Sequence, residues 1–207
     1  MLDYGYLFGG SKKEKFFCQR RSYLTTTWIS EDGEPVSKKI SFFGWVLLFS
    51  RGSAIIFIIV FGLLLKFLLR VFEKPLFGDM RPVSPQITVM VSKISLWLLS
   101  IPVIRFGVPL KQPGAFVANH SSWLDIFALN SGQSLYFVSK SEVARWPGIG
   151  FLAKVTGTLF IRRESKEAIA QKKLFGQRIK MGHRLLFFPE GTSTDGMRVL
   201  PFKSALF

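Results

Sequence analysis

The stretch FVANHSSWLDIF, residues 116–127, joins a short apolar run, a polar loop and the start of a second apolar segment. AFVA before the loop is typical of a buried β-strand, and SSWLDIFALN, residues 121–130, is typical of a helix. A strand followed at once by a helix is the unit from which α/β folds are built. The loop carries His120, one of two histidines in the chain, and Asp125 follows five residues later.

The same alternation continues to the end of the chain. Residues 164–181, ESKEAIAQKKLFGQRIKM, predict a helix, and Gly182 is a natural stop for it. Two β-α-β units favour a mostly parallel sheet flanked by helices, so we expect an α/β domain over residues 107–207. Reactive groups should then lie in the loops that follow the strands. Three further strands are predicted by SLYFV, GTLFI and HRLLFFP.

The composition indicates a polyanionic partner. Twenty-eight Lys and Arg stand against 13 Asp and Glu, which gives a net charge of +15. An anionic membrane fits better than nucleic acid, because the chain has 22 Phe and a long apolar block. Basic residues are also not interleaved with exposed aromatics in any recognisable nucleic-acid module. We therefore expect membrane lipids, and no nucleic acid, as partners.

The apolar block begins near Ser41, after residues 1–40, which we expect to form a polar mobile tail. Residues 53–72 supply the roughly 20 apolar positions that cross a bilayer core, with Lys66 and Arg70 placed to snorkel to one interface. A buried core helix is the alternative.

A second apolar stretch, residues 87–106, either pairs with the first or lies in the interface. We expect one or two membrane-anchoring helices over residues 41–106. Basic residues on both sides leave a single span and a helical hairpin equally open. The start of the chain lacks the pattern of a secretory signal, so we expect the catalytic part to face the cytoplasm.

Metal and disulfide chemistry are not expected. The chain has a single cysteine, Cys18, and its only histidines are His120 and His183. Neither a disulfide framework nor a cysteine or histidine metal site follows from this inventory.

Two interpretations of the stretch around His120 remain open. If Ser122 is an N-cap, Asp125 stands at N3, and the pair forms a capping-box-like arrangement that needs no catalysis. That interpretation leaves His120 unexplained. With His120 on the loop, its ring can fold back over the first helical turn to meet the Asp125 carboxylate, the usual support for a histidine general base.

Two later segments also place polar groups after strands. LLFFPEGTSTDG, residues 185–196, ends an apolar run in a turn with hydroxyls and backbone N–H groups, which can bind an anionic or polyhydroxyl headgroup. An ordinary capped polar loop is the alternative. GTLFIRR, residues 157–163, ends in Arg162 and Arg163, where a sheet would present them to a phosphate.

These three blocks resemble a known family. NHSSWLD, with His120 and Asp125, resembles the N-H-x-x-x-x-D signature of the glycerolipid acyltransferases of the 1-acylglycerol-3-phosphate acyltransferase type. GTLFIRR looks like that family's second block, and FPEGTSTDG followed by RVLPFK is similar to its third. The likeness runs from about Arg105 to the end. RPVSP, VSKSEVA and TSTDG look most like bacterial lyso-ornithine-lipid and related aminolipid O-acyltransferases.

The resemblance implies an enzyme of the inner membrane that moves a fatty acyl group to a lysolipid hydroxyl. The acyl donor would be acyl carrier protein or coenzyme A as a thioester, and no other cofactor is implied. His120 would be the general base and Asp125 its orienting partner, with backbone N–H groups of the His120 loop as candidate oxyanion donors. The acceptor site carried over by position comprises Arg163, Glu190, Gly191, Thr192 and Ser193.

The chain departs from the family in two places. Ser193 stands where the family commonly has an arginine for the acceptor phosphate, so either Arg162, Arg163 or Arg198 substitutes, or the acceptor lacks a glycerol phosphate. The chain also ends at PFKSALF, where the family continues through another helix and at least one strand, so we expect an incomplete C-terminus. A basic membrane-surface protein that binds lipids without turnover is the alternative function.

Overall fold

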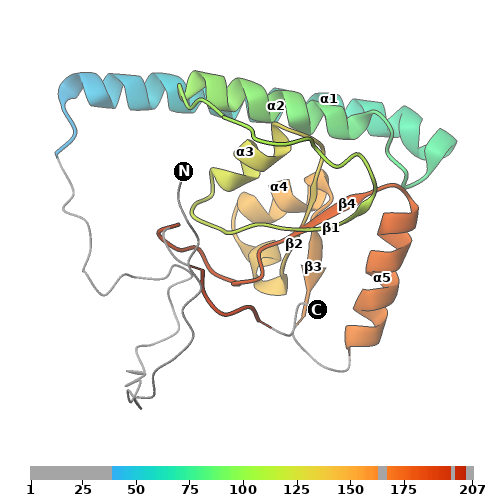
Figure 1. The fold of residues 1–207 in the computed structure, drawn as a ribbon. Coiled ribbons are helices and arrows are strands. Elements are labelled where there is room, and N and C mark those ends of the chain that lie inside the picture. The colour runs from blue at the N-terminus through green and yellow to red at the C-terminus, as the bar shows by residue number, and fades with distance from the viewer. Residues whose placement is uncertain (1–38, 163–166, 197–198, 204–207) are drawn as a thin grey trace, which may run out of the picture.

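The computed structural model describes residues 39–162, 167–196 and 199–203. The predicted mobile tail over residues 1–40 lies almost wholly outside the described residues, and so does Arg163. The elements follow in the order α1 (Phe42–Phe77), α2 (Ser84–Leu98), β1 (Gly114–Val117), α3 (Asp125–Asn130), β2 (Tyr136–Lys140), a 3₁₀ helix η1 (Ser141–Arg145), α4 (Ile149–Thr156), β3 (Leu159–Ile161), α5 (Ala168–Lys180) and β4 (Arg184–Phe187) (Figure 1).

The strands form one parallel sheet in the order β1-β4-β2-β3. Val117 pairs with Phe187 at the β1–β4 junction, and all three strand pairs are parallel. Continuous apolar runs suit the inner strands of such a sheet, which are covered on both faces. Leu185 in β4 is fully buried, at 0% exposure. The predicted α/β architecture with a mostly parallel sheet is therefore confirmed.

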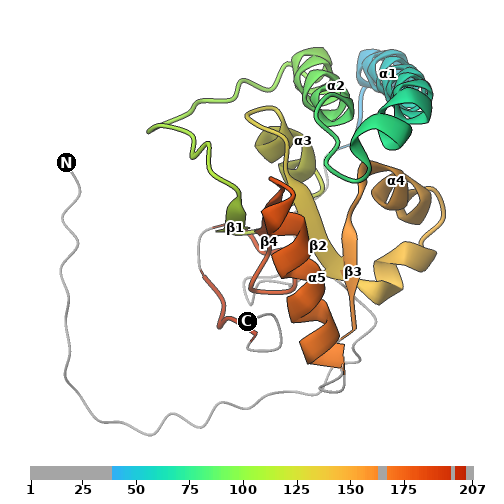
Figure 2. The ribbon, with the colours of Figure 1, turned by 90° about the vertical axis from the view of Figure 1, so that its right-hand side faces the viewer.

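Helix α5 covers one side of the sheet, as its apolar spacing predicts. Phe175 packs edge-on against Phe187 with ring centroids 5.4 Å apart, and Ile179 also lies against the sheet core. Gly182, with φ of 86°, turns the chain from α5 into β4. This contact fixes α5 beside the strands, away from the helices at the start of the chain (Figure 2).

Two local differences from the sequence expectations appear in the connections. The helix predicted from residue 121 begins only at Asp125, because Asp125 itself accepts hydrogen bonds from the backbone of the preceding turn. The β2–β3 connection contains η1 and α4, which the sequence analysis did not predict. The dipeptide Pro147-Gly148 between them interrupts the apolar periodicity and hides both short helices.

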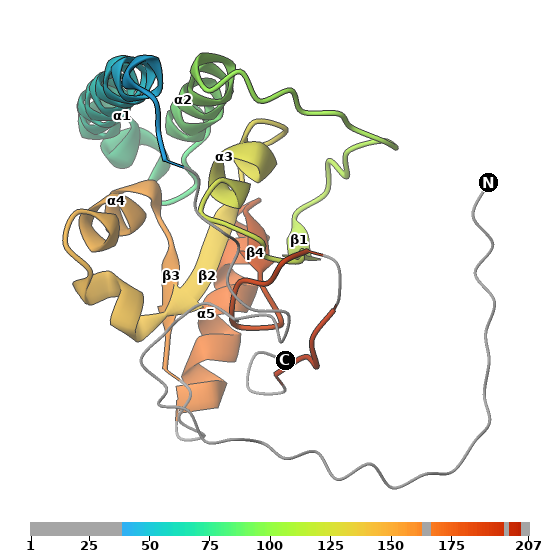
Figure 3. The same cartoon turned by 90° about the vertical axis from the view of Figure 1, so that its left-hand side faces the viewer.

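Helices α1 and α2 lie side by side on top of α3 and α4, and both are seen end-on in Figure 3. Gly62 allows their close approach, since a Cβ there would lie 2.4 Å from Cγ2 of Val91. Lys66, which we expected to snorkel outwards, is instead buried and donates from Nζ to Oγ1 of Thr88 at 2.9 Å. The second apolar stretch therefore pairs with the first.

The outer face of α1 is apolar and uncovered. Phe42, Phe57 and Phe72 are 79%, 66% and 70% exposed. Among the described residues, α1 is the one helix long and apolar enough to cross a membrane, judged by length and composition. Its 36 residues extend about 54 Å at 1.5 Å per residue, which exceeds a hydrocarbon core of about 30 Å. A single span and a helical hairpin with both ends in the cytoplasm both remain predictions.

The buried Gly150 of α4 offers a test of how α4 packs against η1. A Cβ at Gly150 would lie 2.3 Å from the carbonyl oxygen of Ala144, a backbone atom that cannot rotate away. We expect Gly150→Ala to lower the free energy of unfolding by about 1–3 kcal/mol. Thermal unfolding in detergent, followed by circular dichroism, measures the change.

Gly176 in α5 is the matched control, because a Cβ there meets nothing within 4 Å. Gly176→Ala should leave the melting temperature unchanged or raise it, since alanine favours a helix over glycine by up to about 1 kcal/mol. Equal melting temperatures for the two variants would contradict the described contact at Gly150.

Candidate functional site

The loop after β1 brings His120 and Asp125 together. His120 Nδ1 lies 2.7 Å from Asp125 Oδ2, and the two side chains are 24% and 23% exposed. The loop position of His120 makes this contact possible, because residues five apart on a regular helix diverge by about 140°. Of the two interpretations of this stretch, the structure realises the contact between the ring and the carboxylate.

Asp125 is held by the backbone as well as by the histidine. Its Oδ2 accepts from the backbone N–H of Ser121 at 2.7 Å and of Ser122 at 3.0 Å, in addition to the ring. Ser122 is not the N-cap with Asp125 at N3, as the capping interpretation required, because α3 starts at Asp125 and its N-cap is Leu124. The Ser122 hydroxyl accepts instead from the N–H of Leu124 at 3.2 Å.

The hydrogen bonds to Asp125 occupy two backbone N–H groups of the His120 loop. The N–H groups of Ser121 and Ser122 were candidate oxyanion donors, but both are already engaged with Asp125. These two N–H groups hold the Asp125 carboxylate in place beside the His120 ring. The two groups therefore support the histidine's partner and do not point to a substrate carbonyl.

The ring of His120 is held by the Asp125 carboxylate on one edge and by an aromatic ring on one face. An ionised carboxylate only accepts hydrogen bonds, so it favours the tautomer of the neutral ring in which Nδ1 donates and Nε2 carries the lone pair. The ring stacks on Phe188, with centroids 4.1 Å apart and planes 18° apart. Phe188 in turn stacks on Phe137 at 5.9 Å. Sequence reasoning missed Phe188, although an aromatic residue directly before the Pro-Glu-Gly turn was a signal for it.

The turn after β4 lies against the histidine loop. The N–H of Thr194 donates to the carbonyl oxygen of His120 at 2.7 Å. Gly196, with φ of 77°, approaches Ser121 so closely that a Cβ would lie 3.0 Å from Oγ. These contacts join segments more than 70 residues apart, and they follow from the pairing of β1 with β4. The first and third sequence blocks therefore meet in space.

Within this turn, Glu190 faces inwards. Its side chain is buried at 2% exposure, and Oε2 accepts from the N–H of Leu200 at 2.8 Å. The N–H of Lys203 donates to the carbonyl of Pro189 at 3.0 Å, so the following segment folds back along the turn. Glu190 thus organises the turn from within, and a direct contact with substrate stays a prediction.

The remaining residues expected to bind the acceptor lie on the turn or outside the described chain. Gly191 has φ of 68°, a left-handed conformation that glycine adopts without strain. Gly191, Thr192 and Ser193 are all half-buried. Arg163 and Arg198 lie outside the described residues. Binding of substrate by these residues stays a prediction.

Arg162 is the described member of the basic pair after β3. Its side chain is 60% exposed and pairs with Glu167 at 3.2 Å. Strand β3 lies at the opposite side of the sheet from β1, with β4 and β2 between them. Arg162 is therefore not brought beside His120.

No group of three or more His, Cys, Asp or Glu side chains that could hold a metal ion is found among residues 39–162, 167–196 and 199–203. The site consists of an imidazole, a carboxylate and backbone groups. Such a set can move a proton and leaves electrophilic activation to hydrogen-bond donors.

Comparison with known proteins finds lipid acyltransferases among the relatives of this chain. The chain is 54% identical over 157 residues to a lyso-ornithine lipid O-acyltransferase of Rhodobacter capsulatus, a match that covers 76% of this chain and 57% of the relative. A lyso-ornithine lipid O-acyltransferase of Rhizobium meliloti is 41% identical over 117 residues, or 56% of this chain and 40% of the relative.

A 1-acyl-sn-glycerol-3-phosphate acyltransferase of Neisseria gonorrhoeae is 40% identical over 122 residues, covering 55% of this chain and 48% of the relative. The chain thus spans about half the length of these curated relatives. No solved structure matches it significantly.

The family model described as acyltransferase matches residues 103–207, which is just over half of the 207 residues. The match includes β1, the His120 loop and the turn after β4. It confirms the resemblance inferred from the three sequence blocks. This chain belongs to the acyltransferase family.

Proposed function

We propose that this protein transfers a fatty acyl group from an acyl thioester to the free hydroxyl of a lysolipid, as a step in membrane lipid synthesis. The observation that carries the proposal is the 2.7 Å contact of His120 with Asp125, on a loop within the matched family region. The pair supplies a positioned base, which is what the attack of a weakly acidic hydroxyl requires.

The proposed reaction is direct acyl transfer. Nε2 of His120 accepts the proton of the acceptor hydroxyl while the hydroxyl oxygen bonds to the thioester carbonyl carbon. The carbon–sulfur bond then breaks, the ester forms, and the imidazolium returns its proton to the departing thiolate. No acyl-enzyme is needed, and no cofactor is consumed besides the thioester of acyl carrier protein or coenzyme A.

Asp125 supports this cycle through His120. Its carboxylate keeps the proton on Nδ1, so that Nε2 faces the acceptor as a base. It also stabilises the imidazolium that forms, since opposite charges 2.7 Å apart attract strongly where water is partly excluded. A positioned general base of this kind contributes roughly 10²–10⁴ to the rate.

For the acceptor, we propose a lyso-ornithine lipid. The relatives from Rhodobacter capsulatus and Rhizobium meliloti, at 54% and 41% identity, carry that name. Ser193 also stands where the resemblance places an arginine for a glycerol phosphate. A 1-acyl-sn-glycerol-3-phosphate acceptor is the second candidate, favoured by the relative from Neisseria gonorrhoeae.

We further propose that the protein works at the inner membrane with its catalytic domain facing the cytoplasm. The net charge of +15 favours anionic lipid surfaces, and the apolar face of α1 is exposed. Beside the site, Trp123 is 61% exposed and packs edge-on against Phe127. An exposed tryptophan next to the His120 loop suits a site that takes its acceptor from a bilayer surface.

A basic membrane-surface protein that binds lipid without turnover is the alternative. The charge and the exposed apolar helix favour it as much as they favour the enzyme. The His120 site separates the two functions, because lipid binding alone does not need it.

Replacing the histidine tests the enzyme directly. We expect His120→Ala to lower the rate of acyl transfer to lysolipid by roughly 10²–10⁴-fold, since the base is lost. The measurement is transfer of a radiolabelled acyl group to lyso-ornithine lipid in mixed micelles. Arg145→Ala on η1, an exposed position, serves as control and should keep the wild-type rate. Equal, background-level transfer by both variants and the wild type would contradict the proposed enzyme and favour the lipid-binding alternative.

Replacing the carboxylate tests the role of Asp125. Asn can still accept from the two backbone N–H groups, but its neutral amide neither stabilises the imidazolium nor fixes the tautomer. We expect Asp125→Asn to lower kcat at least tenfold with little change in KM for the acceptor. Glu142→Gln, an exposed acid on η1, is the matched control. An unchanged kcat in a normally folded Asp125→Asn variant would remove Asp125 from the mechanism.

Position 193 tests the acceptor. Ser193→Arg introduces the arginine that the resemblance assigns to an acceptor phosphate. We expect this change to raise kcat/KM for 1-acyl-sn-glycerol-3-phosphate relative to lyso-ornithine lipid by roughly 10–100-fold. That factor corresponds to about 1.5–3 kcal/mol for a hydrogen bond to a charged group.

Ser193→Gln adds a similar length without the charge and should not shift the ratio. Wild-type activity on 1-acyl-sn-glycerol-3-phosphate alone would contradict the proposed acceptor while leaving the acyltransferase function intact.

A further inference from the structure

Phe188, the residue that follows β4, lies flat against the ring of His120. The two ring centroids are 4.1 Å apart, and the ring planes are inclined by 18°. The face of a phenyl ring carries the negative part of its quadrupole, and the edge carries the positive part. The negative face of Phe188 is therefore turned towards the imidazole.

Strand β4 determines which side chain reaches the histidine. Successive side chains of a strand point to opposite faces of the sheet. Phe187 packs on Phe175 of α5, with ring centroids 5.4 Å apart, and Phe188 points the other way, to His120. The carbonyl oxygen of Phe188 accepts from the N–H of Gly191 at 3.0 Å, which ties its backbone into the turn. Strand and turn thus set the place of the Phe188 ring.

A second ring supports Phe188. Phe137 of β2 stacks on it, with ring centroids 5.9 Å apart and planes inclined by 24°. Because β2 pairs directly with β4, with Phe137 opposite Leu186, this contact follows from the register of the sheet. Both phenyl rings are half-buried, so they form a partly exposed wall beside the imidazole.

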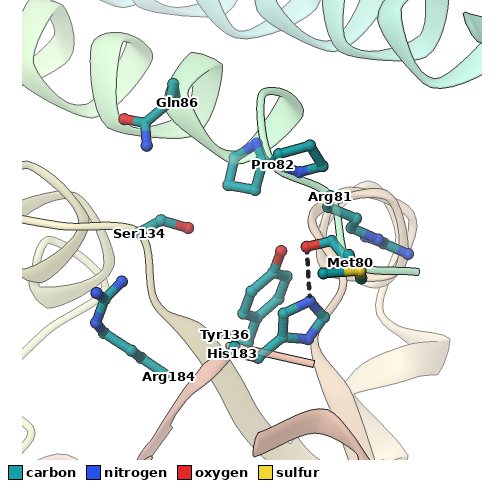
Figure 4. Close-up of a pocket in the computed structure, with 10 residues that line it drawn as sticks. Met80, Arg81, Pro82, Gln86, Ser134, Tyr136, His183 and Arg184 are labelled. Carbon is teal, nitrogen blue, oxygen red and sulfur yellow. Dashed lines mark hydrogen bonds between the residues drawn. The ribbon is translucent and has the colours of Figure 1, made fainter. Parts of the chain in front are cut away.

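The second histidine of the chain shows what a stacked ring does without an acid. His183 stacks on Tyr136 with ring centroids 4.2 Å apart, and its Nε2 donates to the carbonyl oxygen of Met80 at 3.3 Å (Figure 4). Burial lowers the pKa of His183, so this ring is neutral near pH 7. Stacking alone therefore does not provide a base. His120 combines the stacked ring with the Asp125 carboxylate and with a side chain that is 24% exposed.

The contact between Phe188 and His120 becomes more favourable when the imidazole gains a proton. A cation over the face of an aromatic ring is attracted by the ring quadrupole, and a neutral ring lacks most of this attraction. In the proposed reaction, the imidazolium forms as the acceptor hydroxyl loses its proton. A contact that strengthens at that point lowers the barrier, because it stabilises the transition state more than the resting enzyme.

We propose that Phe188 is a positioning residue for the acyl transfer: its ring holds the plane of the His120 imidazole and stabilises the imidazolium that forms there. This role rests on the proposed function and adds a second support to it. Asp125 acts on the edge of the imidazole, at Nδ1, whereas Phe188 acts on one face. Phe188 acts through His120 and needs no contact with the substrate.

A pair of unnatural residues separates the charge distribution of the ring from its shape. The residues para-cyanophenylalanine and para-ethynylphenylalanine have nearly the same size, but the cyano group withdraws electrons and weakens the attraction of the ring face for a cation. With these residues at position 188, we expect kcat to be lower by roughly twofold or more for the cyano protein. KM for the acceptor should be equal in the two proteins. The measurement is transfer of a radiolabelled acyl group to lyso-ornithine lipid in mixed micelles.

Conventional variants test the ring itself. Phe188→Leu removes the ring, and we expect it to lower kcat by roughly 2–30-fold with little change in KM, the factor that about 0.5–2 kcal/mol produces. Phe188→Tyr keeps the ring face and should restore most of the wild-type kcat. Phe175→Leu removes a half-buried ring on the other face of β4 and should keep the wild-type kcat. Equal losses of kcat in Phe188→Leu and Phe175→Leu would indicate general loosening of β4 and would overturn the role.

NMR of ¹³C-labelled histidine in dodecyl maltoside measures the stack without turnover. The chain has two histidines, so His183 supplies an internal reference. The ring current of Phe188 should shift the His120 ring signals, and Phe188→Leu should remove this shift while the His183 signals stay in place. Unchanged His120 signals in that variant would overturn the stack. If Phe188→Leu does not fold, the cyano and ethynyl proteins still decide.

The outcomes separate this role from the function on which it rests. Absence of acyl transfer by the wild-type protein would contradict the proposed function and, with it, the role of Phe188. Equal kcat values for the cyano and ethynyl proteins, measured beside an active wild-type protein, would overturn the role of Phe188 alone.

Discussion

Parallel pairing of β1 with β4 is the constraint on which the site depends. The loops after these two strands emerge at the same edge of the sheet, and only there can the N–H of Thr194 reach the carbonyl of His120. The pairing suits these residues, because β1 is apolar and Leu185, Leu186 and Phe187 of β4 are all buried. A sheet in which β4 ran the other way would place the two loops at opposite edges.

At that edge, one oxygen atom collects three donors. The ring of His120 and two successive backbone N–H groups converge on Oδ2 of Asp125. The start of α3 adds its partial positive charge, since Asp125 is the first helical residue. The Asp125 carboxylate is therefore held in place by the protein itself. Its contact with Nδ1 in turn orients the ring of His120.

The sequence was sufficient for the parts of the fold that local patterning controls. Apolar runs and helical spacing predicted the four strands and α5, and the resemblance of three blocks located the His120 region. The start of α3 was misplaced because a side-chain-to-backbone contact, invisible to periodicity, competes with the helix there. Phe188 and the carbonyl of His120 were missed because their partners are distant in the chain. Lys66 was misplaced because its hydrogen bond to Thr88 depends on how α2 docks.

That hydrogen bond has a mechanical consequence. The buried amino group of Lys66, which donates to Thr88, and the close approach at Gly62 hold α2 against α1 in one register. Helix α2 packs in turn on α3, which begins at Asp125. If the apolar face of α1 meets the bilayer, as proposed, this rigid stack sets the height of the imidazole above the lipid. The α1–α2 hairpin would then set the distance between the His120 ring and the bilayer surface. That distance would determine which hydroxyl group of a lipid reaches the base.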